Sequence, residues 1–137
     1  MKRVLIALLF LQFFSACSNE SSTDNDDLST ATNFIRFALD GKFDKAEQLM
    51  VADPVNKERL DDTRRIYERM KKEDQVNLMN ASIQIHDSKE LPDGSRVFFY
   101  SNSYRNKRDS LKVVPSDGRW LVDLKYTFGS IGNSNAE

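Results

Sequence analysis

The sequence predicts an α+β fold in which N-terminal helices pack on a curved antiparallel sheet of about four strands. Two observations lead to this prediction. Apolar residues recur at helical spacing in the first half of the domain, up to about residue 72. From Gln75 onward the spacing falls to two, which is typical of strands with one buried face. Helices first and strands second is the element order of an α+β domain, with the helices covering one face of the sheet.

Two short segments with helix signals open the domain. We expect the first helix from about Ser29 to Asp40, and Gly41 can supply the left-handed residue that ends it. Asp44-Lys45-Ala46-Glu47 resembles a capping box, so a second, short helix should start with Asp44 as its cap.

A third helix should begin at Asp53-Pro54, because aspartate is a good cap and proline is favoured in the first turn. We expect it to end near Lys72. The helical period predicts that five of its residues face the core, namely Val55, Leu60, Ile66, Tyr67 and Met70.

Four strands are predicted after this helix, around residues 81–86, 97–100, 111–114 and 120–128. Turn-forming residues at 92–95 and 115–118 separate them and favour a meander. In the second strand, alternation places Phe98, Tyr100 and Tyr104 on one face and Val97 and Phe99 on the other.

The N-terminus has the three parts of a secretory signal peptide. Lys2 and Arg3 are basic, residues 4–14 are almost entirely apolar, and small residues follow at Ser15 and Ala16. The apolar run is too short to span a bilayer. We therefore expect residues 1–16 to be removed as a signal peptide.

Phe14-Ser15-Ala16-Cys17 resembles the lipobox of bacterial lipoproteins, with phenylalanine where leucine is usual. The resemblance implies that Cys17, the only cysteine, is lipidated with fatty acids such as palmitate and anchors the chain to a membrane. By the sorting rules of such lipoproteins, Ser18 implies the outer membrane, on its periplasmic face or at the cell surface.

The rest of the chain divides into a tether, one domain and a tail. Residues 17–27 form a polar tether after the lipidated cysteine, residues 28–128 the domain, and residues 129–137 a polar tail. Loss of Lys2 and Arg3 with the signal would change the formal net charge from −1 to about −3. This balance gives no general attraction to nucleic acid.

Two further segments resemble those of small nuclear-transport-factor-like (cystatin-like) lipoproteins. They are Gly41-Lys42-Phe43-Asp44-Lys45-Ala46 and Asp117-Gly118-Arg119-Trp120-Leu121-Val122-Asp123. The resemblance implies a cone-shaped fold, in which a curved sheet wraps the helices and leaves a pocket at its open end. That superfamily contains isomerases, dehydratases and epoxide hydrolases as well as binding modules, so the fold alone does not decide the function.

The sequence contains few candidates for catalysis or metal binding. The acid–base candidates are His86, Asp87, Asp109 and Asp123. Alternation and neighbouring turns place all four at the surface, and none matches a catalytic set of the superfamily. One histidine and a lipidated cysteine are too few for a zinc site, so we expect neither a metal nor a cofactor.

The aromatic residues and one basic loop are the candidates for binding. Phe98, Tyr100, Tyr104 and Trp120 could recognise a ligand, form a homodimer interface or pack in the core of a bent sheet. Residues 105–108, Arg-Asn-Lys-Arg, are expected to form a charged hairpin loop, with a ligand clamp as the alternative.

The sequence thus favours an envelope-anchored, non-catalytic binding or accessory module for a small hydrophobic ligand or a protein partner. The alternative is a lyase or isomerase that uses an acidic residue or His86 in the pocket. A third reading is a structural subunit of a larger envelope complex.

Overall fold

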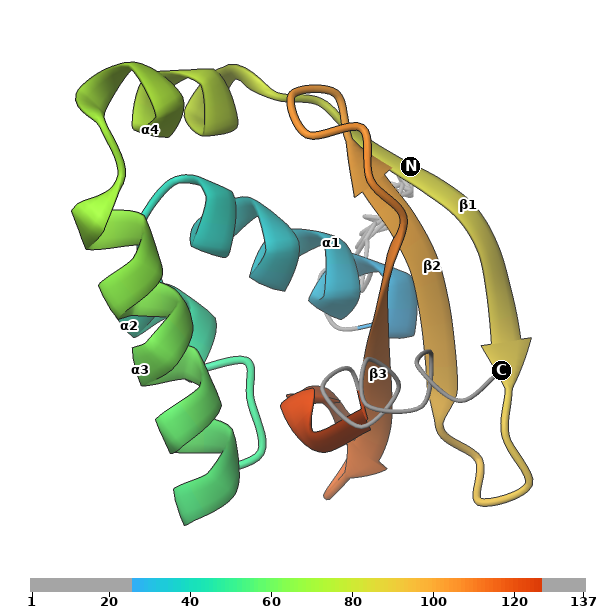
Figure 1. Ribbon diagram of the computed structural model, residues 1–137. Coiled ribbons are helices and arrows are strands. Elements are labelled where there is room, and N and C mark those ends of the chain that lie inside the picture. Colours follow the sequence, from blue (N-terminus) through green and yellow to red (C-terminus); the bar gives the residue numbers. More distant parts are fainter. Residues whose placement is uncertain (1–25, 127–137) are drawn as a thin grey trace, which may run out of the picture.

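The computed structural model describes residues 26–126, which form four helices followed by a four-stranded sheet (Figure 1). The helices are α1 (Asp27–Leu39), α2 (Phe43–Glu47), α3 (Pro54–Arg69) and α4 (Lys72–Asn80). The strands are β1 (Ile83–Glu90), β2 (Arg96–Asn102), β3 (Asp109–Ser116) and β4 (Arg119–Asp123). The predicted α+β class is confirmed. The predicted signal peptide, Cys17 and the predicted tail lie outside the described residues.

The strands form an antiparallel meander in the order β1-β2-β3-β4. Figure 1 shows that the sheet is curved and that α1 lies between it and α3. Helix α1 contacts all four strands. Its buried residues, among them Phe34 and Ile35, form one core with Phe98, Leu111 and Val122 of the sheet.

The predicted helix ends are confirmed at two positions. Gly41 has φ +73°, and the amides of Gly41 and Lys42 donate to the carbonyls of Ala38 and Phe37, which is the Schellman pattern. At α3, the carboxylate of Asp53 accepts a hydrogen bond from the Asn56 amide at 2.9 Å.

Two predicted starts are wrong by one or two residues. Helix α1 begins earlier, because Asp26 caps it by accepting from the Ser29 amide at 2.6 Å, so Asp26 and Asp27, predicted as part of the tether, belong to the start of this helix. Helix α2 begins at Phe43 and its cap residue, Lys42, makes no side-chain hydrogen bond. Asp44 lies in the first turn instead and pairs with Arg64 at 2.9 Å.

The predicted strand-like period from Gln75 is wrong up to Asn80, because these residues belong to α4. Only Leu78 is buried in this helix, so its sequence carries little helical period. Glu73 and Asp74 in the first turn favour the positive end of a helix. Arg36 supports the other end by donating to the carbonyls of Met79 at 2.9 Å and Ala81 at 2.6 Å.

The last strand is shorter than predicted. It ends at Asp123, and residues 124–126 form a helical turn. The turn predicted at residues 115–118 is confirmed. It consists of Asp117 and Gly118, which both have positive φ. The outer edge of β4 is covered, since the Val122 amide donates to Leu49 and the Val51 amide to the Val122 carbonyl.

Helix α3 buries less than its sequence pattern predicted. Leu60 is 2% exposed as expected, but Val55 is 44% and Ile66 58% exposed. The helix packs through a narrow stripe that includes the buried Asn56, so two apolar residues at helical spacing fall outside it.

Candidate ligand pocket

A cavity of about 380 Å³ lies between α1, α3, β2 and the start of β3. Its floor consists of core side chains that turn one surface toward it, namely Phe34, Ile35, Phe43, Leu111 and Leu124. Its size falls within the range of small-molecule sites, which are mostly apolar with a few placed polar groups.

Helix α3 supplies one wall of the cavity through Thr63, Ile66, Tyr67 and Met70. Ile66 is the most exposed of the large apolar side chains described in residues 26–126. Its exposure is explained by this position, because it faces an open cavity rather than a packed core. The helical period placed Ile66 among apolar neighbours but could not distinguish a core from a cavity wall.

The loop between β2 and β3 forms the rim and carries three cations, Arg105, Lys107 and Arg108. Asn102 shapes this loop: its side-chain oxygen accepts from the Arg105 amide at 2.9 Å, and its carbonyl accepts from the Asn106 amide at 2.8 Å. The Arg105 guanidinium reaches back across the mouth to Met70 Sδ at 3.8 Å.

Tyr100 and Asp109 are ionisable groups on the cavity wall, as is Tyr67 on α3. Tyr100 and Asp109 face one another in the β2–β3 pairing. Burial raises the pKa of the Tyr100 phenol, and the neighbouring Asp109 carboxylate raises it further. The phenol therefore stays protonated at neutral pH and can donate a hydrogen bond.

The four predicted binding aromatics are not brought together. Phe98 is a core residue, 3% exposed, and Trp120 packs against the same core from β4. Tyr100 alone lines the cavity. Tyr104 lies beyond the end of β2, so the predicted shared strand face does not extend to it, and its hydroxyl donates to Asp74 of α4 at 2.6 Å.

Of the acid–base candidates, only Asp109 lines the cavity. His86 sits at a bulge in β1, is exposed, and its Nε2 lies 2.8 Å from the Ser101 hydroxyl. Asp87 is exposed on the same strand, and Asp123 lies next to Lys125 at 3.9 Å. The exposed position predicted for His86 is confirmed.

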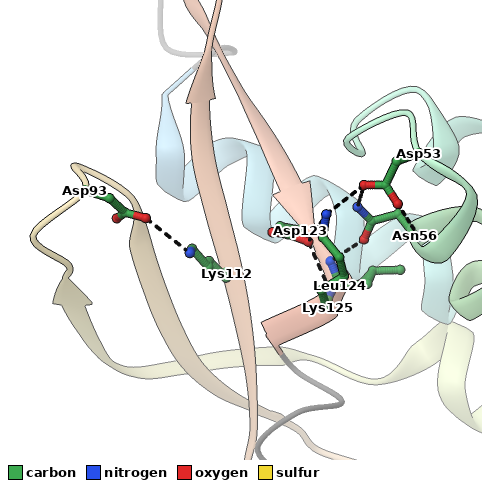
Figure 2. Close-up of polar contacts among 7 residues, drawn as sticks. All are labelled: Asp53, Asn56, Asp93, Lys112, Asp123, Leu124 and Lys125. Atoms are coloured by element: carbon green, nitrogen blue, oxygen red, sulfur yellow. Dashed lines mark hydrogen bonds and ion pairs between the residues drawn. The ribbon is translucent and has the colours of Figure 1, made fainter.

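A polar network centred on the buried Asn56 holds the cavity floor to α3 (Figure 2). Asn56, fully buried, accepts from the Leu124 amide at 2.7 Å and donates to Asp53 at 2.8 Å. Lys125 donates to the same Asp53 carboxylate at 2.8 Å, and these contacts lower the pKa of Asp53 to about 2. Because Leu124 forms part of the floor, this network places the floor relative to α3.

Asp93 and Lys112 form a second, separate contact at 3.4 Å (Figure 2). Asp93 also accepts from the amide and the hydroxyl of Ser95, and these bonds, with Lys112, lower the pKa of its carboxyl group. This cluster fixes the β1–β2 turn, and neither residue lines the cavity.

Comparisons with known proteins identify no relative: no protein-family model, no curated protein and no solved structure matches the chain. None of the helices in residues 26–126 has the length and apolar character needed to cross a bilayer. The same part of the chain contains no cluster of three or more metal-ligating side chains.

Proposed function

We propose that this chain is a lipoprotein of the bacterial cell envelope whose domain binds a small hydrophobic ligand without chemically changing it. The observation that carries the proposal is the cavity, because its floor is made of apolar side chains from α1, α2, β3 and the turn after β4. Such a cavity resembles the pocket expected at the open end of a cone-type fold, which we propose for this domain.

The ligand proposal can be tested by methyl NMR of the full chain during titration with 4-phenyl-1-butanol, a soluble apolar probe. We expect shifts at the methyls of Ile66, Leu111 and Leu124, which line the cavity. Val97 and Leu121 point to the opposite sheet face, since each neighbours a helix-facing residue in its strand, and their methyls should not shift.

A cavity-filling variant sharpens this test. Ala38 lines the cavity on α1, so Ala38→Leu should occupy part of it and weaken binding of the probe. Asn33→Leu adds the same side chain at an exposed position of the same helix and serves as the matched control. Equal binding by both variants would contradict the assignment of the ligand to this cavity.

The anchor proposal concerns Cys17, which lies outside the described residues. We propose that its thiol is acylated and that the outer membrane holds the protein, as the lipobox resemblance and Ser18 imply. Growth with an alkyne-bearing fatty acid should label the wild-type chain and not Cys17→Ser. Labelling of the variant, or its retention on the membrane after processing, would argue against this anchor.

A lyase or isomerase is the second candidate function, and the position of Asp109 favours it. This carboxylate lines the cavity beside the protonated Tyr100 phenol, so a base and a proton donor lie at one site. If the protein is such an enzyme, Asp109→Asn should abolish turnover of a bound substrate while the substrate still binds. A ligand recovered unchanged after incubation with the wild type favours the non-catalytic proposal.

A further inference from the structure

The two ends of the cavity differ sharply in charge. The floor carries apolar side chains, and four of the five residues from 105 to 109 line the mouth. Three of these are cations, Arg105, Lys107 and Arg108, and one is the carboxylate of Asp109, which leaves a formal charge of +2. The chain as a whole has a formal charge of −1, so this local excess is opposite in sign to the overall balance.

The three rim cations are available to a ligand. All three side chains are exposed, and within residues 26–126 none forms an ion pair with a carboxylate. By contrast, Arg36, Arg64 and Arg96 are each paired with an aspartate. Arginine presents a planar fork of donors that matches a carboxylate in a bidentate geometry, which makes Arg105 and Arg108 suited to an anionic head group.

The size of the cavity limits the ligand. One water-sized group occupies roughly 30 Å³, so the cavity of about 380 Å³ holds on the order of a dozen non-hydrogen atoms. That volume accommodates a head group with a short chain or one aromatic ring.

We propose that the ligand is an amphipathic monoanion, a carboxylate carrying an apolar tail. Its head would lie at the rim cations and its tail on the apolar floor that includes Phe34 and Leu111. This inference rests on the proposed binding function, because it names the ligand class of the same cavity. Asp109 at the same rim disfavours ligands that carry a second negative charge.

Three soluble probes of nearly equal size and shape test the charge preference in the full chain. They are 4-phenylbutyrate, 4-phenyl-1-butanol and 4-phenylbutylamine, each with about a dozen non-hydrogen atoms. We expect calorimetry to show at least about tenfold tighter binding of the acid than of the amine, with the alcohol between them. Raising the salt concentration should weaken binding of the acid and leave that of the alcohol unchanged.

A triple variant, Arg105→Gln with Lys107→Gln and Arg108→Gln, tests the rim itself. Each exposed ion pair contributes only modestly, so losing all three cations should weaken binding of the acid roughly tenfold or more. The matched control removes three exposed cations that do not line the cavity, Arg69, Lys89 and Arg119, each changed to Gln. It carries the same change in net charge and should bind the acid nearly as well as the wild type.

The outcomes separate this inference from the proposed function. If the alcohol binds as tightly as the acid and the rim variant has no effect, the anion preference is wrong and the cavity binds a neutral ligand. If the rim and control variants weaken binding equally, the effect is one of net charge and the rim assignment is wrong. If no probe binds and no cavity methyl shifts, both proposals fail together.

Discussion

Replacement of Asn56 by alanine should destabilise the domain, because its buried side chain makes two hydrogen bonds. It accepts from the Leu124 amide at 2.7 Å and donates to Asp53 at 2.8 Å, while the Asn56 backbone amide donates to Asp53 at 2.9 Å. In Asn56→Ala the capping bond to the amide remains, but the buried Leu124 amide loses its acceptor and Asp53 loses one donor.

The magnitude follows from these two losses. A buried donor left without a partner costs about 1–3 kcal/mol. Asp53 is 26% exposed and keeps Lys125 and the Asn56 amide as donors, so its loss of one donor adds little. We therefore expect a decrease of about 1–3 kcal/mol in the free energy of unfolding.

Urea denaturation followed by tryptophan fluorescence can measure this change, since Trp120 is the only tryptophan and packs against the core. Asn33→Ala, at an exposed position of α1, is the matched control and should change stability by less than about 0.5 kcal/mol. If Asn56→Ala unfolds at the same urea concentration as the control, the network between α3 and Leu124 does not hold the fold together.

Three other perturbations test separate parts of the structure. Gly41→Ala should lower the thermal stability more than Gly94→Ala. Both glycines have positive φ, but only at Gly41 would a Cβ lie 2.7 Å from the Tyr67 ring. Equal decreases in the melting temperature would contradict that contact. Arg36→Met removes two hydrogen bonds to carbonyls at the end of α4 and should lower the free energy of unfolding by about 1–3 kcal/mol. Relative to the wild type, hydrogen exchange should increase more in α4 than in α1. Because the pKa of Asp53 is lowered to about 2, the unfolded state binds more protons below pH 5, so stability should fall as the pH drops from about 5 toward 2. Asp53→Asn should flatten that dependence in acid titrations of unfolding, and an unchanged slope would exclude Asp53 as its source.

Sequence patterns predicted the parts of the fold that local chemistry determines. Gly41 as a left-handed stop, Asp53 as a cap and the Asp117-Gly118 turn each depend on one or two residues and their own backbone. Helix α4 was missed because only Leu78 of it is buried, and because the hydrogen bonds at its end come from Arg36, more than forty residues earlier in the chain. Contacts of that range leave no trace in local periodicity.

The cavity could be predicted only in part. The sequence indicated a basic loop at residues 105–108 and an aromatic strand, but it could not show that Tyr100 faces the same space as Ile66. Phe98 and Trp120 looked equivalent to Tyr100 by residue type, and the register of the strands decides which of them reaches the core. The position of the cavity therefore depended on tertiary packing, whereas the types of residue that line it were visible beforehand.

The energetics of an unfilled cavity support a ligand rather than a packing defect. If a cavity of about 380 Å³ were closed and dry, it would cost roughly 9 kcal/mol at about 24 cal/mol per Å³, as much as the entire stability of many small domains. The exposed Ile66 and the cationic rim instead place its mouth in solvent, so the apolar side chain of Ile66 is open to water. A ligand that displaces this water recovers free energy, and at a hundred times its Kd it would stabilise the fold by about 2.7 kcal/mol. The acid probe should therefore raise the melting temperature of the wild type more than that of Ala38→Leu, in which the floor is already partly covered.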